Sequence, residues 1–200
     1  MSFVKDFRCT LCHQSFAPDN HLLTCPSCGE KGILEIEYDY EAMKKTVNRD
    51  YFKNNRDYSM WRYAPMMTIP PTHISEMLRV GWTPLYRSYR LGKQLGIKEL
   101  YVKDEGLNPS GSTKDRASGV AVLKAIEAGK KTVSCSSTGN AASSLACQAA
   151  HMGLDAVIFV PKRAPIGKLT QLSIYGSTLI CVDGDYKDTY NLSRDAIAEH

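Results

Sequence analysis

Long apolar runs in the second half of the chain predict a buried parallel sheet. Residues 155–161 (DAVIFVP) and 177–184 (STLICVDG) are apolar over most of their length. Such continuous runs are typical of strands that are covered on both faces. Shorter runs at 99–104 (ELYVKD) and 132–136 (TVSCS) also predict strands.

Helical segments separate these strands. One helix is predicted from about 115 to 128, apolar on most sides and ended by Gly129. Residues 141–152 are mostly small, so a helix there can lie close to a sheet, and 168–176 predict a short helix. The alternating order of strands and helices predicts an α/β fold with a doubly wound, mostly parallel sheet.

Three regions follow from these patterns. Residues 1–35 form a separate module, 36–99 an irregular segment of the larger domain, and 100–200 the α/β domain. A last helix begins after Asp185 and reaches His200 without a terminator. We therefore expect the chain to be the N-terminal part of a longer enzyme, with an incomplete α/β domain.

The composition of the chain limits which binding partners and which cellular compartment we expect. The 200 residues are 43% hydrophobic and 23% charged, an ordinary globular balance. The net charge is +4, and Lys and Arg form no continuous block, so the composition does not require a nucleic-acid partner. No signal-peptide core opens the chain, and its apolar runs are too short to cross a bilayer. We expect a cytoplasmic protein with no membrane or nucleic-acid partner.

Four of the seven cysteines form two Cys-x-x-Cys pairs, spaced as x2, x12 and x2: Cys9, Cys12, Cys25 and Cys28. Four thiolates make a closed tetrahedral site suited to a structural zinc ion, so we predict a zinc ribbon. Redox pairs and unliganded cysteines are the alternatives. A ribbon can also bind nucleic acid, but the dense basic stripe needed for phosphate contacts is missing.

A hydroxyl-rich loop with one lysine precedes the first helix of the α/β domain. It reads NPSGSTKDR (108–116) and contains Lys114. Ligands of open α/β sheets bind near the carboxyl ends of the strands, and a lysine there can form a Schiff base with a carbonyl cofactor. A solvated charge is the alternative for a lone lysine. Asp115 suits the helix dipole, and Arg116 suits an ion pair near the site.

The loop SSTGNA (136–141) opens the next helix. The N-terminus of a helix can bind a carboxylate, and Gly139 permits a tight turn with close approach of a ligand. The same loop can instead be a simple helix cap. A lysine beside an anion-binding loop indicates pyridoxal phosphate and an amino-acid substrate.

NPSGSTKDR together with STGNAASSLA resembles the pyridoxal-phosphate dependent enzymes of the tryptophan synthase β type, called fold type II. Within them the chain resembles the threonine synthases. The cysteine ribbon, SMWRYAP (59–65), GWTPL (81–85) and GKLTQLSIYGS (167–177) agree with this. The resemblance implies that one lysine binds the cofactor and moves protons, one asparagine bonds the ring hydroxyl, and one loop holds the substrate carboxylate. These are, in order, Lys114, then Asn140, then Ser137, Thr138, Gly139 and Ala141.

The resemblance also implies a reaction, in which O-phosphohomoserine and water give threonine and phosphate. It leaves a homodimer open. Lys162, Arg163 and Lys168 are candidates for binding the leaving phosphate, although each can be a surface charge. The family's glycine-rich loop for the cofactor phosphate and its partner of the pyridine nitrogen do not occur in these residues, so we expect both beyond His200.

Two other functions compete with this one. A sibling enzyme, such as a threonine or serine ammonia-lyase or a cysteate synthase, shares both loops. A non-catalytic zinc-ribbon binding protein built on an inactive enzyme domain belongs to a different class. The presence of both Lys114 and Asn140 argues against that last reading.

Overall fold

The N-terminal module is a small antiparallel sheet with the strand order β2-β1-β3. The computed structural model describes residues 3–19, 22–69 and 72–199. Phe7 lies opposite both Phe16 and Ile36, so the central strand pairs on both sides. The strands are β1 (Val4–Cys9), β2 (Ser15–Phe16) and β3 (Leu34–Tyr38).

Short helices follow the ribbon, in a region whose sequence predicted irregular structure. Asp39 and Asn48 begin two of them, because each side chain accepts a hydrogen bond from a backbone N–H of the first turn. These helices are α1 (Tyr40–Thr46) and α2 (Arg49–Asn54), followed by the 3-10 helices η1 (Met60–Met66) and η2 (Ile74–Glu76).

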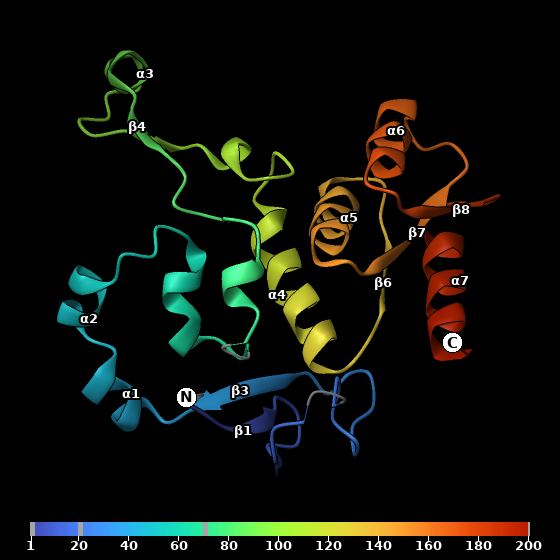
Figure 1. The fold of residues 1–200 in the computed structure, drawn as a ribbon, viewed down its shortest axis with the longest axis horizontal. Helices are drawn as coiled ribbons and strands as arrows, with labels where there is room; N and C mark the ends of the chain where they lie inside the picture. The colour runs from blue at the N-terminus through green and yellow to red at the C-terminus, as the bar shows by residue number, and fades with distance from the viewer. Residues whose placement is uncertain (1–2, 20–21, 70–71, 200) are drawn as a thin grey trace.

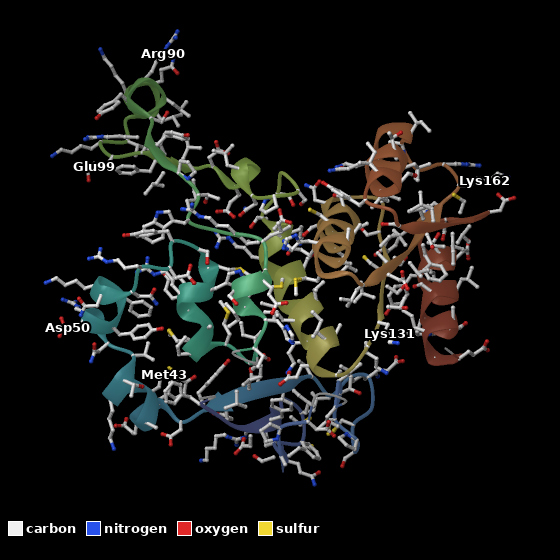
Figure 2. All side chains as sticks on the ribbon, in the orientation of Figure 1. Met43, Asp50, Arg90, Glu99, Lys131 and Lys162 are labelled. Atoms are coloured by element: carbon white, nitrogen blue, oxygen red, sulfur yellow. The ribbon has the colours of Figure 1, made fainter. Side chains whose placement is uncertain are left out.

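The strand predicted at 99–104 forms, but not in the parallel sheet. It is β5 (Tyr101–Lys103), which pairs antiparallel with β4 (Leu85–Arg87). The helix α3 (Tyr89–Leu95) connects these two strands along the chain. All three β5 residues are exposed, so they bury no face against the domain. These elements form an arm that projects from the body in Figure 1, and Arg90 and Glu99 mark it in Figure 2. The prediction of a first parallel strand there is therefore wrong.

The remaining strands form the expected parallel sheet, in the order β6-β7-β8. Helix α5 packs on one face and α7 on the other, with α4 and α6 against α5 (Figure 1). The predicted helices and strands are confirmed, since each overlaps its expected range. They are α4 (Lys114–Glu127), β6 (Thr132–Ser136), α5 (Asn140–Met152), β7 (Asp155–Pro161), α6 (Ile166–Ile174), β8 (Thr178–Val182) and α7 (Tyr186–Glu199).

The core lies where α4, α5 and the sheet meet. Val122 and Leu123 of α4 are fully buried, as are Ile158 and Val160 of β7. Small side chains on α5 let the two helices and the sheet approach closely. The fully buried alanines are Ala142, Ala146 and Ala149. Among the described residues, no helix combines the length and apolar character needed to cross a membrane.

A fully buried carboxylate joins the helices α4 and α5. Oδ2 of Asp115 accepts from N and Oγ of Ser110, at 2.8 and 2.9 Å. Its Oδ1 accepts from Oγ of Ser144 at 3.1 Å and from Nε2 of Gln148 at 3.4 Å. A carboxylate so far from water needs such donors, so this contact ties the lysine loop, α4 and α5 together.

We expect Asp115→Ala to lower the free energy of unfolding by about 3 kcal/mol, because buried donors on Ser110, Ser144 and Gln148 lose their acceptor. Urea unfolding of the purified protein measures the change. Asp183→Ala is the control, since that side chain is 89% exposed. Equal unfolding free energies for the two variants would show that the buried carboxylate contributes nothing.

Candidate active site

Lys114 is the first residue of α4, and its side chain is exposed. Its backbone N–H donates to Oγ of Ser112 at 3.2 Å, and Thr113 precedes the helix without capping it through its side chain. The neighbouring Asp115 is fully buried. The lysine amine is therefore accessible while the backbone that carries it is held from inside the protein.

A second carboxylate holds the other side of this loop. Glu105 accepts from Nε and Nη2 of Arg116, both at 2.8 Å, and from Oγ1 of Thr83 at 2.7 Å. Nδ2 of Asn108 donates to the same carboxylate at 3.0 Å. The hydrogen bonds from Arg116 are the main reason that the pKa of Glu105 lies far below its usual range. The expectation that Arg116 forms an ion pair is confirmed.

The GWTPL segment (81–85) is hydrogen-bonded to the lysine loop. The N–H of Gly81 donates to Oδ1 of Asn108 at 2.9 Å. Gly81 has φ +80°, and a Cβ there would lie 2.8 Å from Nη1 of Arg116. Only glycine fits both the backbone conformation and the space. The motif is therefore part of the frame that positions the lysine loop.

The helix α5 begins without a side-chain cap. Oγ of Ser137 accepts from the N–H of Gly139 at 3.2 Å, and the first bond of the helix runs from N of Ser143 to O of Gly139. The backbone N–H groups of Asn140, Ala141 and Ala142 thus precede the helical ladder. Uncapped N–H groups at the positive end of a 13-residue helix can hold an anion, whereas the capping alternative finds no support here.

The two predicted loops lie near one another because of Asp115. That residue follows Lys114, and its partner Ser144 lies one helical turn beyond Asn140. The N-terminal ends of α4 and α5 point to the same side of the molecule in Figure 1. The backbone positions of Lys114 and Asn140 are thus brought to the same side of the molecule by the contact between α4 and α5.

One of the three predicted phosphate-binding candidates reaches this region. Nζ of Lys168 donates to Oδ1 of Asn140 at 3.0 Å. Lys162 is mostly exposed and lies 3.7 Å from Asp183, on the loop before α6 (Figure 2). Arg163 is exposed beside it. The sequence pattern did not distinguish these three residues, because only the packing of α6 on α5 brings Lys168 to Asn140.

The four N-terminal cysteines form one cluster, with all sulfur atoms within 4.8 Å of one another. Sγ of Cys12 and Cys25 are 3.7 Å apart. Four sulfurs at about 2.3 Å from one ion would be about 3.8 Å apart, so the cluster fits zinc. Gly32 is required, since a Cβ there would lie 2.5 Å from Cβ of Cys25.

The thiols of the cluster differ in their proton affinities. A hydrogen bond from the backbone of Cys12 is the main cause that lowers the pKa of Cys9 to about 6. A hydrogen bond with the side chain of Cys12 is the main cause that raises the pKa of Cys28 to about 12. Thiols so close together cannot all ionise unless a cation lies between them.

Sequence reasoning underrated two carboxylates of the site. The sequence favours a helix-dipole role for Asp115, yet this residue is the buried link between α4 and α5. Glu105 was not singled out at all, although it collects four hydrogen bonds from three side chains. The sequence offers one signal for this ion pair. Glu105 lies at the end of a predicted strand, and Arg116 lies two residues after Lys114 in the loop that follows.

A family model described as "Pyridoxal-phosphate dependent enzyme" matches residues 77–200. The threonine synthase of Methanocaldococcus jannaschii is 40% identical over 193 residues, which are 96% of this chain and 47% of that protein. The threonine synthase of Methanosarcina acetivorans is 36% identical over 188 residues, or 94% of this chain and 45% of that protein. The chain thus spans about half the length of these curated relatives.

A solved structure shares the fold. Maize serine racemase superposes with a TM-score of 0.54 at 28% identity, over 58% of this chain and 36% of that one. The match to this α/β enzyme supports the fold-type expectation that was based on the two loops.

We expect Glu105→Gln to destabilise the protein at pH 7 by about 2 kcal/mol, because the charged hydrogen bonds with Arg116 are weakened. The pKa of Glu105 is lowered in the folded state, so its contribution is complete above the unfolded value of about 4.3. That contribution is lost as the pH falls below this value. Urea unfolding at pH 7 and pH 4 should therefore show a smaller pH dependence in the variant.

Glu41→Gln is the control for this experiment, because Glu41 forms an ion pair with Lys44 while its side chain is 81% exposed. A Glu105 variant that keeps the pH dependence of the original protein would contradict the assignment.

Proposed function

This chain belongs to the pyridoxal-phosphate dependent enzymes, and we propose that its protein is a threonine synthase. The substrates would be O-phosphohomoserine and water, and the products threonine and phosphate. The observation that carries the choice is the 40% identity to a threonine synthase over 96% of this chain. The two loops joined by Asp115 support the cofactor assignment independently.

The residues present fit pyridoxal phosphate. Lys114 offers an accessible amine on a backbone held by Asp115 and Glu105. Asn140 offers an amide at the start of α5 for the oxygen of the cofactor ring. When bound, the cofactor supplies an electron sink for the carbon atoms next to the substrate nitrogen.

Lys114 would move the protons of the reaction. Its Nζ would take a proton from Cα of the substrate and later one from Cβ, after which phosphate leaves from Cγ and water adds at Cβ. A single amine can serve several steps only if its position is constant, since small misplacement slows proton transfer strongly. The buried contacts of Asp115 are the physical basis for that constancy.

The substrate carboxylate would bind at the start of α5. The loop at the start of α5 would supply the groups that bind it. These are the hydroxyl groups of Ser137 and Thr138 and the backbone at Gly139 and Ala141. The free N–H groups and the helix dipole favour a negative charge there. Such a site would orient the substrate with its amine toward Lys114.

We expect the complete protein with pyridoxal phosphate to release phosphate and threonine in equal amounts from O-phosphohomoserine. Lys114→Ala should abolish this turnover, because no other group is assigned to the proton transfers. Phosphate and ammonia are measured side by side with phosphohomoserine, serine and threonine as substrates. Rapid ammonia release from serine or threonine, with phosphohomoserine unchanged, would indicate an ammonia-lyase instead.

We also propose that the cysteine cluster binds one structural zinc ion. Four sulfur ligands leave no open coordination position, so the metal would stabilise the ribbon rather than react. The enzyme would act on a free amino acid in the cytoplasm, without nucleic-acid or membrane partners. A homodimer remains a prediction.

We expect Cys25→Ser to release about one zinc ion per chain from the complete protein. A lost thiolate leaves three ligands and weakens the site strongly. Metal analysis of protein purified without added zinc gives the result. Cys181→Ser is the matched control, since Cys181 is exposed and lies outside the cluster. A stably folded ribbon that contains no metal would disprove the zinc site.

A further inference from the structure

The amide of Asn140 has a charged neighbour on a different helix. Nζ of Lys168 on α6 donates to its Oδ1 at 3.0 Å. The two residues are 28 positions apart in the sequence, so the contact depends on the packing of α6 against α5. It is therefore a tertiary contact at the start of α5, next to the uncapped helix end.

This contact decides the orientation of the amide. An ammonium group is only a donor, so it can face the amide oxygen but not the amide NH2 group. Oδ1 therefore points to Lys168, and Nδ2 points to another side. Within the described ranges of the chain, Nδ2 donates to no protein acceptor. One donor at the start of α5 is thus both oriented and available.

Lys168 is itself held in place. Its Nζ also donates to Oε1 of Gln171 at 3.4 Å, one turn further along α6. Leu172 of the same helix is almost fully buried in the core, and Leu169 packs against it. The lysine is half-buried. Two side-chain oxygens therefore hold its ammonium group beside Asn140, in a contact that is exposed to solvent and so open to a ligand.

We propose that Lys168 is a positioning residue that turns the Asn140 amide so that Nδ2 donates to the anionic ring oxygen of the cofactor. The inference rests on the proposed function, because it takes pyridoxal phosphate as the ligand of this site. The positive charge on the oxygen side also polarises the amide and strengthens its N–H donor. Lys168 acts through Asn140 and does not itself touch the cofactor.

The test is a double-mutant cycle on cofactor affinity in the complete protein. Lys168→Met, Asn140→Ala and the double variant are titrated with pyridoxal phosphate, and the absorption band of the bound cofactor is followed. Loss of one oriented, charge-assisted hydrogen bond should weaken binding about tenfold in Lys168→Met. Lys168→Arg should restore most of the affinity, because a guanidinium group also only donates.

The cycle separates positioning from a general structural effect. In the Asn140→Ala background, Lys168→Met should cause no further loss, since the amide that it orients is gone. Lys131→Met is the matched control and should bind the cofactor normally, because Lys131 is exposed and lies before β6, away from α6 (Figure 2).

Three results would overturn the proposal. Additive losses in the double variant would show that Lys168 acts independently of Asn140. Unchanged cofactor affinity with a raised KM for phosphohomoserine would place Lys168 on the substrate anion instead. Failure of the unsubstituted protein to bind pyridoxal phosphate would overturn the proposed function as well, and only that result removes the cofactor band from every variant.

Discussion

The buried carboxylate of Asp115 is the constraint on which the candidate site depends. A charged group with no access to water is stable only if surrounding donors replace its hydration. Those donors come from the lysine loop, through Ser110, and from α5, through Ser144 and Gln148. Satisfying this one side chain therefore brings together two segments that are otherwise far apart in the sequence. The positions of Lys114 and Asn140 follow from it.

Close packing makes this constraint possible. Several small side chains of α5 are buried, and Ala142, Ser144 and Ala146 are fully so. One turn beyond Asp115 on α4, a Cβ at Gly119 would lie 3.0 Å from the ring of Trp61. Larger residues at the buried positions of α5 would hold α4 and α5 apart and lengthen the hydrogen bonds to Asp115, and a larger residue at Gly119 would push α4 away from η1. The small-residue pattern of the sequence and the buried polar link are thus two parts of one arrangement.

The sequence predicted local elements well and tertiary partners poorly. The strands predicted at 155–161 and 177–184 could be found because continuous apolar runs are typical of strands covered on both faces. The segment 99–104 also has the pattern of a strand, but the pattern of apolar residues does not indicate which strand it pairs with. In the structure it pairs with β4. The cysteine spacing predicted a cluster because its geometry is local to two tight turns.

The parts of the site that sequence could not predict are the contacts across elements. Asp115 looked like a helix-dipole residue because nothing in its neighbourhood indicates that α5 will cover it. Lys168 looked like Lys162 and Arg163 for the same reason. A charged residue acquires its role from the packing of the element that carries it, and periodicity contains no information on that packing.

The positive groups at the site support the proposed substrate, which has two negative groups. The positive ends of α4 and α5 lie on the same side of the molecule, and Lys114 and Lys168 lie at or beside them (Figure 1). Of the two carboxylates nearby, Glu105 is paired with Arg116, whereas Asp115 is hydrogen-bonded only by uncharged donors. An amino acid with a carboxylate and a phosphate group would be attracted by this field, whereas a zwitterion without the second anion would be attracted less.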